Sequence, residues 1–405
     1  MKTLLVISGG IEAVEGIRIA RKKGFRVIVS DGNPAAPGFK FADEKIIAST
    51  YDEKLTAREA LRINRRVRID GVITIASDVP YTVAYVAGEL HLKSYSRKIA
   101  ALCSDKLALK SYLAKKNITL PWFSRVASAK ALKAVIAKKG YPLVIKPVDN
   151  RGARGVLRIT PDIDPEWAFH ESRSYSPSKR VIVEEWLYGI QISTESVVWD
   201  GAIVTPGSSD RNYEFLDRYK PYVIENGGEL PCSLTSRQWR QVERLLERAI
   251  RSLGTFRGTI KGDIVFTQDG PRILELAPRL SGGYFCSQTI PLATGVDLVG
   301  AAFDIALGKK PVWSRLKPAR KRYVVQRFFF PGEGLVKRIS YVERAKKMPG
   351  VRLLKVYVRK GDRIKKPTCH PERAGMVVTT GATPQEAMDR AKKVISTVSF
   401  ELDKG

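Results

Sequence analysis

The hydrophobic positions of the first hundred residues change repeatedly between short continuous runs and a helical spacing. The apolar runs are TLLVIS, FRVIVSD, DEKIIAS and DGVITIAS, and helical stretches such as residues 11–23 lie between them. Short apolar runs that alternate with helices are typical of parallel strands covered on both faces. We therefore predict a doubly wound parallel sheet in this part of the chain.

Glycine and polar residues follow these predicted strands. Gly9 and Gly10 come after the first strand, Asp31 ends the second, and Asp78 follows the fourth. Ligands of doubly wound sheets bind at the carboxyl ends of the strands, so we expect these residues to share one edge. The Gly9-Gly10 turn does not match the G-x-G-x-x-G fingerprint, and a dinucleotide site is therefore not indicated.

The remaining chain predicts mixed α and β structure. A helix is expected from about residue 104, with Lys106 in its first turn, and an amphipathic helix over residues 236–253. Strands are expected around residues 141–159 and 181–189, and strand-like runs after Gly308 precede a final helix. We expect α/β and α+β structure in three domains: a doubly wound domain over 1–103, a central domain over 104–308, and a small α+β domain over 309–405.

Composition narrows the class of protein. The 405 residues are 44% hydrophobic, which is enough to build two or three cores, and no window holds eighteen uninterrupted apolar residues. The N-terminus passes directly from a short apolar run into a turn, so we expect a cytoplasmic protein without a membrane span. The four cysteines and three histidines are scattered, which argues against a zinc site or a disulfide framework.

The charge is strongly positive and uneven. The formal net charge is +29, and residues 309–367 contain 20 basic and 3 acidic residues. Such a segment is typical of proteins that bind an anionic ligand, an acidic carrier protein, a membrane surface or nucleic acid. The alternative is the charged, solvated surface of a heat-adapted protein. Aromatic residues such as Tyr323 and Phe328 within this segment fit nucleic-acid binding, but their strand pattern is more typical of a core.

A single carboxylate, Glu275, interrupts the apolar strand RILEL. Simple alternation between strand faces accounts for it, and so does a role as an oxygen ligand of Mg²⁺. Residues 262–276 read as a hairpin: a three-residue loop ending at Gly270 places Asp263 opposite Glu275. A two-residue Asp269-Gly270 turn pairs Ile264 with Glu275 instead. Only the first register brings two carboxylates about 5 Å apart, where a cation between them relieves their repulsion.

A glycine-rich loop, DNRGARG, follows a strand that ends in Lys146-Pro147. Gly152 and Gly155 allow backbone N–H groups to approach phosphate oxygens, and Arg154 adds positive charge. An ordinary hairpin turn is the alternative interpretation of this loop.

The order of these parts resembles the ATP-grasp superfamily over nearly the whole chain. The resemblance implies an ATP-grasp fold and binding of ATP with Mg²⁺ or, in its place, Mn²⁺. It further implies a metal site at Asp263 and Glu275. The residues it implies for ATP binding are Lys106, Lys146, Gly152, Arg154, Gly155, Glu184, Glu185, Leu187 and Gln191.

The run ELAPRLSGG, followed by PLATGVDL, is most similar to carboxylate-amine ligases, including L-amino-acid ligases. In this resemblance Arg279 binds the substrate carboxylate or acyl phosphate, and Lys261 lies beside the transferred phosphoryl group. The chain departs from the family at Gln191, where many relatives carry a ribose-binding glutamate. It departs again at Ala277, where many carry a metal-binding asparagine.

We therefore expect an ATP-dependent carbon-nitrogen ligase that joins a small-molecule carboxylate to an amine through an acyl phosphate and releases ADP and phosphate. A homodimer is compatible with this expectation. The nearest alternative is a carboxylating or formylating ATP-grasp enzyme of nucleotide biosynthesis, whose substrate phosphate would use residues 8–10. The alternative from another class is a nucleic-acid-binding or scaffold protein that uses residues 309–367.

Overall fold

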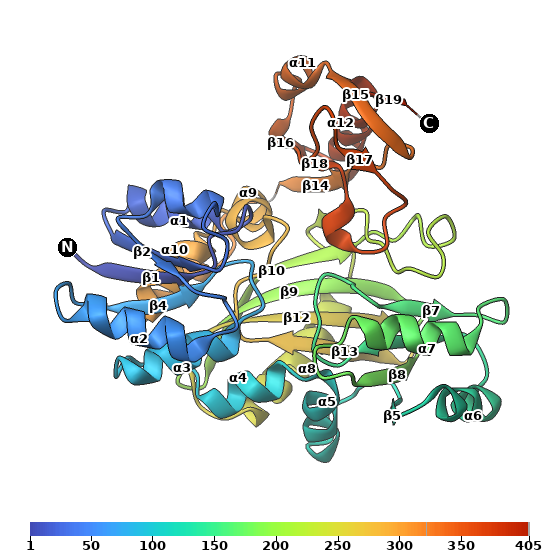
Figure 1. The fold of residues 1–405 in the computed structure, drawn as a ribbon, viewed down its shortest axis with the longest axis horizontal. Coiled ribbons are helices and arrows are strands. Elements are labelled where there is room, and N and C mark those ends of the chain that lie inside the picture. Colours follow the sequence, from blue (N-terminus) through green and yellow to red (C-terminus); the bar gives the residue numbers. More distant parts are fainter. Residues whose placement is uncertain (321, 404–405) are drawn as a thin grey trace. The chain divides into compact units, whose positions relative to one another are not determined.

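The computed structural model describes residues 1–320 and 322–403, which form two compact units (Figure 1). The first unit contains residues 1–120, 193–208 and 234–320, and the second contains residues 121–192, 209–233 and the chain after residue 320. No helix in the described part of the chain is long and apolar enough to cross a membrane.

The first unit begins with a four-stranded parallel sheet whose order is β3-β2-β1-β4. Its strands are β1 (Thr3–Ile7), β2 (Arg26–Asp31), β3 (Glu44–Ile47) and β4 (Gly71–Thr74). All residues of β1 and β4 are buried, as expected for apolar strands that are covered on both faces. The helix α1 (Val14–Lys22) connects β1 to β2, α2 (Glu53–Asn64) connects β3 to β4, and α3 (Pro80–Glu89) follows β4. The predicted parallel sheet is confirmed, although α1 begins three residues later than expected.

Two helices lead from this sheet into the central part of the chain, α4 (Arg97–Cys103) and α5 (Lys106–Lys115). The Asp105 side chain accepts a hydrogen bond of 2.9 Å from the Ala108 N–H and caps α5, so Lys106 is its first residue. Leu109 and Leu113 lie one turn apart and are buried, so this face of the helix packs inward.

The first unit also contains antiparallel strands in the order β13-β12-β9-β10. Their bounds are β9 (Ile190–Trp199), β10 (Ala202–Arg211), β12 (Arg257–Thr267) and β13 (Gly270–Ala277). The amphipathic helix α8 (Ser236–Ser252) packs on β12 and β13, and Thr235 and Gln238 form a capping box at its start. The helices α9 (Ile290–Thr294) and α10 (Leu298–Ala306) complete this unit.

The second unit contains a four-stranded antiparallel sheet in the order β5-β8-β6-β7. Its strands are β5 (Phe123–Val126), β6 (Leu143–Pro147), β7 (Leu157–Ile159) and β8 (Val181–Glu185). The helices α6 (Ala129–Lys139) and α7 (Pro165–Ser174) contribute buried residues such as Leu132 and Phe169 to the same core as this sheet.

The C-terminal part of the second unit is an α+β structure. Strands β11 (Gly228–Leu230), β14 (Tyr323–Phe328), β18 (Gly375–Gly381) and β16 (Val351–Val356) are neighbours in this order. A three-stranded sheet is formed by β17 (Arg363–Ile364), β15 (Gly334–Ser340) and β19 (Ser399–Asp403), and two helices, α11 (Val342–Lys346) and α12 (Pro384–Thr397), pack beside these strands. Phe328 and Phe329 are only 4% and 2% exposed, so at these positions the strand pattern indicates core rather than a nucleic-acid surface.

Candidate functional site

Two acidic side chains face each other on the β12–β13 hairpin. Asp263 is paired with Glu275 in the strand register, as one of the two sequence interpretations predicted. The expected three-residue loop is wrong, because Thr267 pairs with Gly270 and the loop is Gln268-Asp269. A β-bulge between Asp263 and Ile264 restores the register that the shorter loop would otherwise lose.

Each of these carboxylates is in contact with a lysine. Lys106 Nζ lies 3.2 Å from Glu275 Oε1, and Lys261 Nζ contacts Asp263 Oδ2. Ser193 on β9 donates a hydrogen bond of 2.7 Å to Asp263 Oδ1. Four of the predicted site residues of the first unit are therefore brought together on neighbouring strands and the first turn of α5.

The two acids suit a hard cation such as Mg²⁺. This ion is commonly held by one or two protein carboxylates, with phosphate oxygens and water as its other ligands. The described residues contain no group of three or more His, Cys, Asp or Glu side chains that could hold a metal by themselves. A site built on Asp263 and Glu275 therefore fits a metal that arrives together with phosphate.

Arg279 lies two residues after the end of β13. Its Nε donates a hydrogen bond of 3.2 Å to Asp78 Oδ1, and its Nη1 donates one of 3.2 Å to the Leu280 carbonyl. Burial disfavours the charged guanidinium, but the charge of Asp78 and its hydrogen bond outweigh burial and raise the pKa of Arg279. The nearby Asp297 pairs instead with Lys23 at 2.7 Å.

The 279–283 segment, which follows the β12–β13 hairpin, is held by acids that the sequence did not single out. Glu195 accepts two hydrogen bonds of 2.9 Å from Ser281, one from its N–H and one from its hydroxyl. Glu12 accepts one of 3.0 Å from the Gly283 N–H. Leu280 forms a parallel bridge with Ile75, just beyond the end of β4. The carboxyl end of the parallel sheet therefore shapes the segment that carries Arg279.

In the second unit, Lys146 and Glu184 form a buried ion pair. They lie on neighbouring strands, β6 and β8, and Lys146 Nζ is 2.9 Å from Glu184 Oε1. Glu184 is only 2% exposed. Glu185 accepts a hydrogen bond of 2.7 Å from the Trp122 N–H. Leu187 lies half-buried after the end of β8, and Gln191 lies near the start of β9.

The glycine loop turns sharply between β6 and β7. Gly152 and Gly155 have φ values of 63° and 68°, in the left-handed region that favours glycine. Arg154 Nη1 donates a hydrogen bond of 3.2 Å back to the Arg151 carbonyl. The Gly152 carbonyl accepts one of 3.0 Å from the His370 N–H, so the loop is attached to the segment before β18.

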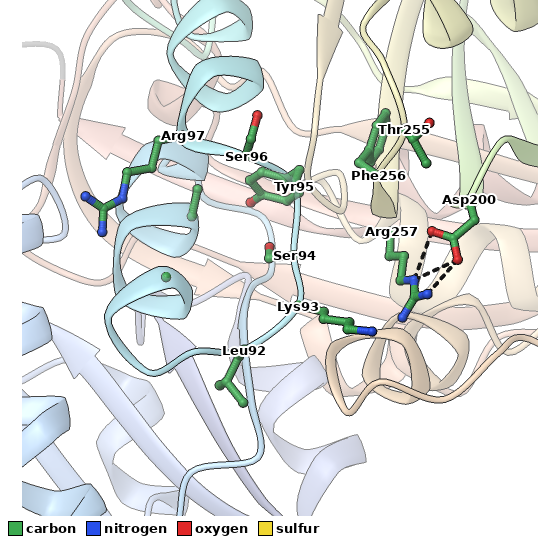
Figure 2. A pocket seen from close by; sticks show the side chains of 12 residues that line it. Leu92, Lys93, Ser94, Tyr95, Ser96, Arg97, Asp200, Thr255, Phe256 and Arg257 are labelled. Carbon is green, nitrogen blue, oxygen red and sulfur yellow. Dashed lines mark hydrogen bonds and ion pairs between the residues drawn. The ribbon is translucent and has the colours of Figure 1, made fainter.

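Figure 2 shows a pocket of about 450 Å³ in the first unit. Its wall combines the residues after α3 with the β9–β10 turn and the start of β12, where Arg257 is paired with Asp200 at 2.6 Å. None of the predicted site residues lines this pocket.

Two segments of the chain match models of known protein families. A model of the ATP-grasp domain matches residues 103–283, and a model of the L-amino acid ligase C-terminal domain 2 matches residues 327–403. The chain is 24% identical over 413 residues to the uncharacterized protein y4rH of Sinorhizobium fredii, which covers 99% of this chain and 83% of that protein.

Two further relatives cover the chain almost completely. The chain is 23% identical over 416 residues to a formate-dependent phosphoribosylglycinamide formyltransferase of Sulfurisphaera tokodaii. The alignment covers 98% of this chain and 96% of that protein. The L-amino acid ligase from Bacillus licheniformis has the same fold, with a TM-score of 0.84 at 18% identity over 100% of this chain and 99% of the other. Residues 103–283 are therefore an ATP-grasp domain, and residues 327–403 are an L-amino acid ligase C-terminal domain 2.

Proposed function

We propose that this protein is an ATP- and Mg²⁺-dependent ligase that joins a carboxylate to an amine through an acyl phosphate. The observation that carries the proposal is the opposition of Asp263 and Glu275, each beside a lysine, on the hairpin that leads to Arg279. The ATP-grasp match and the C-terminal domain named for L-amino acid ligases support the same reaction class.

Asp263 and Glu275 would hold the metal. When bound, Mg²⁺ or Mn²⁺ neutralises charge on the phosphate oxygens and on the transferring phosphoryl group. Lys106 contacts Glu275 and Lys261 contacts Asp263, so both ammonium groups lie where they would also contact the oxygens of a metal-bound phosphate.

The second unit contributes a set of proposed nucleotide contacts. Lys146 would bind phosphate with its charge, and Gly152, Arg154 and Gly155 would cover the phosphates through N–H groups and a guanidinium. Glu184, Glu185, Leu187 and Gln191 would surround the adenosine. The buried pair of Lys146 and Glu184 supports a shared role, since each orients the other side chain.

Arg279 would bind the substrate carboxylate or the acyl phosphate, and Lys261 would contact the transferred phosphoryl group. A carboxylate oxygen of the substrate attacks the γ-phosphorus, and the bond to the β-γ bridging oxygen breaks, which releases ADP. The amine nitrogen then attacks the carbonyl carbon, phosphate leaves with the attacking carboxylate oxygen, and the nitrogen loses a proton. Both steps depend on positioning and on compensation of negative charge.

A formylating or carboxylating enzyme is the second candidate, favoured by the similarity to the formate-dependent phosphoribosylglycinamide formyltransferase. That reaction class would place a substrate phosphate near residues 8–10. The Gly9 N–H already donates a hydrogen bond of 2.8 Å to Asp31, and the Gly10 N–H donates one of 3.4 Å to Ser8 Oγ. These engaged donors favour the carboxylate-amine ligase.

The proposal is tested by screening for ADP and phosphate release with ATP, Mg²⁺ and pooled amino acids, other carboxylates, nucleotides and polyamines. We expect release that requires both an acid and an amine, with ADP and phosphate formed in equal amounts. Release that depends instead on formate or bicarbonate with a phosphorylated amine would support the second candidate. AMP as the nucleotide product would contradict both.

A further inference from the structure

Glu195 is a buried carboxylate on β9. It lies on the same face of this strand as Ser193, the residue that donates a hydrogen bond to Asp263. Both residues are on β9 and two positions apart, so their side chains point to the same side of the sheet. Ser193 binds Asp263 on the neighbouring strand, and Glu195 is completely buried. A charged group is rarely left in such a position unless several partners compensate for its lost hydration.

The hydrogen bonds of Glu195 are directed to one residue, Ser281. Oε1 accepts 2.9 Å bonds from the Ser281 N–H and Oγ, and Oε2 lies 3.4 Å from the same N–H. Ser281 is 3% exposed and follows Arg279 by two positions. The Ser281 carbonyl in turn accepts a hydrogen bond of 3.1 Å from the Cys286 thiol. The carboxylate therefore fixes the backbone just beyond Arg279.

The charges around Glu195 come from the proposed reaction groups. Burial raises the pKa of Glu195 to about 7, while the Ser281 hydrogen bonds and the positive charges of Arg279 and Lys261 act against this increase. Glu195 in turn contributes to the raised pKa of Arg279. The same carboxylate thus interacts with the backbone of the 279–283 segment and with both basic groups proposed to handle the acyl phosphate.

We infer that Glu195 is a positioning residue of the ligase reaction: its buried carboxylate fixes the 279–283 segment, and with it Arg279, at the acyl-phosphate site. The inference rests on the proposed function for its catalytic part. Its structural part, the fixing of the segment, does not depend on which substrates the enzyme uses.

The test compares Glu195→Gln with the control Glu247→Gln, which makes the same change at an exposed position of α8. Glutamine keeps the size and one acceptor oxygen but removes the charge. We expect amide hydrogen exchange in residues 279–286 of the full-length protein to be faster by about tenfold, the scale of one weakened charge-assisted hydrogen bond. Exchange in β12 should stay unchanged in both variants.

The kinetic measurement adds a readout that a purely structural residue would not change. With an active acid and amine pair, Glu195→Gln should lower kcat by about tenfold or more while the KM for ATP stays the same. In the wild type, kcat should fall on acidification through about pH 7, where Glu195 takes up a proton, and this fall should be absent in Glu195→Gln.

The outcomes separate the inference from the proposed function. Unchanged exchange in residues 279–286, or unchanged kcat with the same pH profile, would overturn the positioning role. If the wild type releases ADP with no pair of substrates, the proposed function fails, and the exchange measurement still decides the structural part. If Glu195→Gln does not fold, Ser281→Ala takes its place, because it removes only the hydroxyl donor and should shift exchange and kcat in the same directions.

Discussion

Asp263 lies opposite Glu275 because a β-bulge compensates for a two-residue loop in the β12–β13 hairpin. Without the bulge, the pairing of Thr267 with Gly270 would place Leu274 opposite Asp263 and turn Glu275 to the other face of the sheet. The pairing of the two acids therefore depends on the bulge. Lys106 and Lys261 compensate their charges in the absence of a metal.

The first prediction concerns the proposed metal ligand Glu275. Glu275→Gln should lower substrate-dependent ADP release by about a hundredfold or more, because it removes one of two anionic ligands for the cation. The melting temperature should change little, since the side chain lies on a partly exposed strand face. Asp269→Asn is the matched control, because its carboxylate is 67% exposed in the loop of the same hairpin. Equal activity in Glu275→Gln and the control would exclude the metal role.

The fold was predictable because it depends on local patterns. The apolar runs of β1, β2 and β4 and the start of α5 with Lys106 in its first turn are properties of short stretches, and the structure has them where the sequence predicted them. The opposed acids were also predicted, but from an incorrect loop. A β-bulge leaves no distinct signal in a strand of alternating residues. The only hint of this bulge in the sequence was the pair of acids, Asp263 and Glu275, that it places opposite each other.

The partners of the site residues were not predictable in the same way. Asp78 and Arg279 are separated by 201 positions, and their contact depends on how the chain folds back. Glu195 does carry a signal in the sequence, since an acid within the strand ISTESVVW poses the same question as Glu275. Its partner Ser281 gives no such signal, because one buried serine resembles any other.

The second prediction concerns Arg279. Arg279→Lys should keep ATP affinity but lower carboxylate-dependent ADP release by about a hundredfold, because one ammonium cannot reproduce a planar pair of donors. If Arg279 only forms a structural ion pair with Asp78, the variant would instead lose stability and keep its activity. Nucleotide titration, thermal unfolding and ADP release on this variant distinguish the two roles.

The third prediction concerns the glycine loop and its attachment to His370. We expect trypsin to cleave after Arg151 or Arg154 in the free protein and to cleave more slowly with a non-hydrolysable ATP analogue, as for other phosphate-covering loops. Cleavage after Lys138 and Lys139 at the end of α6 serves as the internal control. Equal protection of both regions, or of neither, would argue against a nucleotide-dependent cover.

The fourth prediction concerns pH and stability. Burial lowers the pKa of His370 to about 3, with the charge of Arg373 acting in the same direction. A histidine in the unfolded chain has a pKa of about 6.5. Between about pH 6.5 and pH 3 the unfolded chain therefore binds a proton at His370 that the folded chain does not bind, so acidification favours unfolding. The melting temperature should fall as the pH is lowered from about 6.5 to 5, and less so in His370→Gln.

The exposed His91 provides the control for this measurement, since His91→Gln should retain the full pH dependence of the wild type. Glu225, whose N–H donates a hydrogen bond of 3.3 Å to His370 Nε2, has a lowered pKa: burial would raise it, but the charges of Arg211 and Arg373 outweigh burial. Its own contribution to stability is lost only at more acidic pH, below about 4.3. An identical pH dependence in wild type and His370→Gln would contradict the assignment to His370.

We propose that the reaction passes through an acyl phosphate. Transfer of an oxygen atom from the substrate carboxylate to the released phosphate tests this intermediate most directly. The substrate carboxylate is labelled with ¹⁸O, the reaction is run with ATP, Mg²⁺ and the amine, and the phosphate released is analysed by mass spectrometry. Attack of a carboxylate oxygen on the γ-phosphorus, followed by displacement by the amine, transfers one labelled oxygen to each phosphate. We predict this single label in phosphate formed by the wild type. Unlabelled phosphate, formed together with the ligated product, would contradict the mechanism.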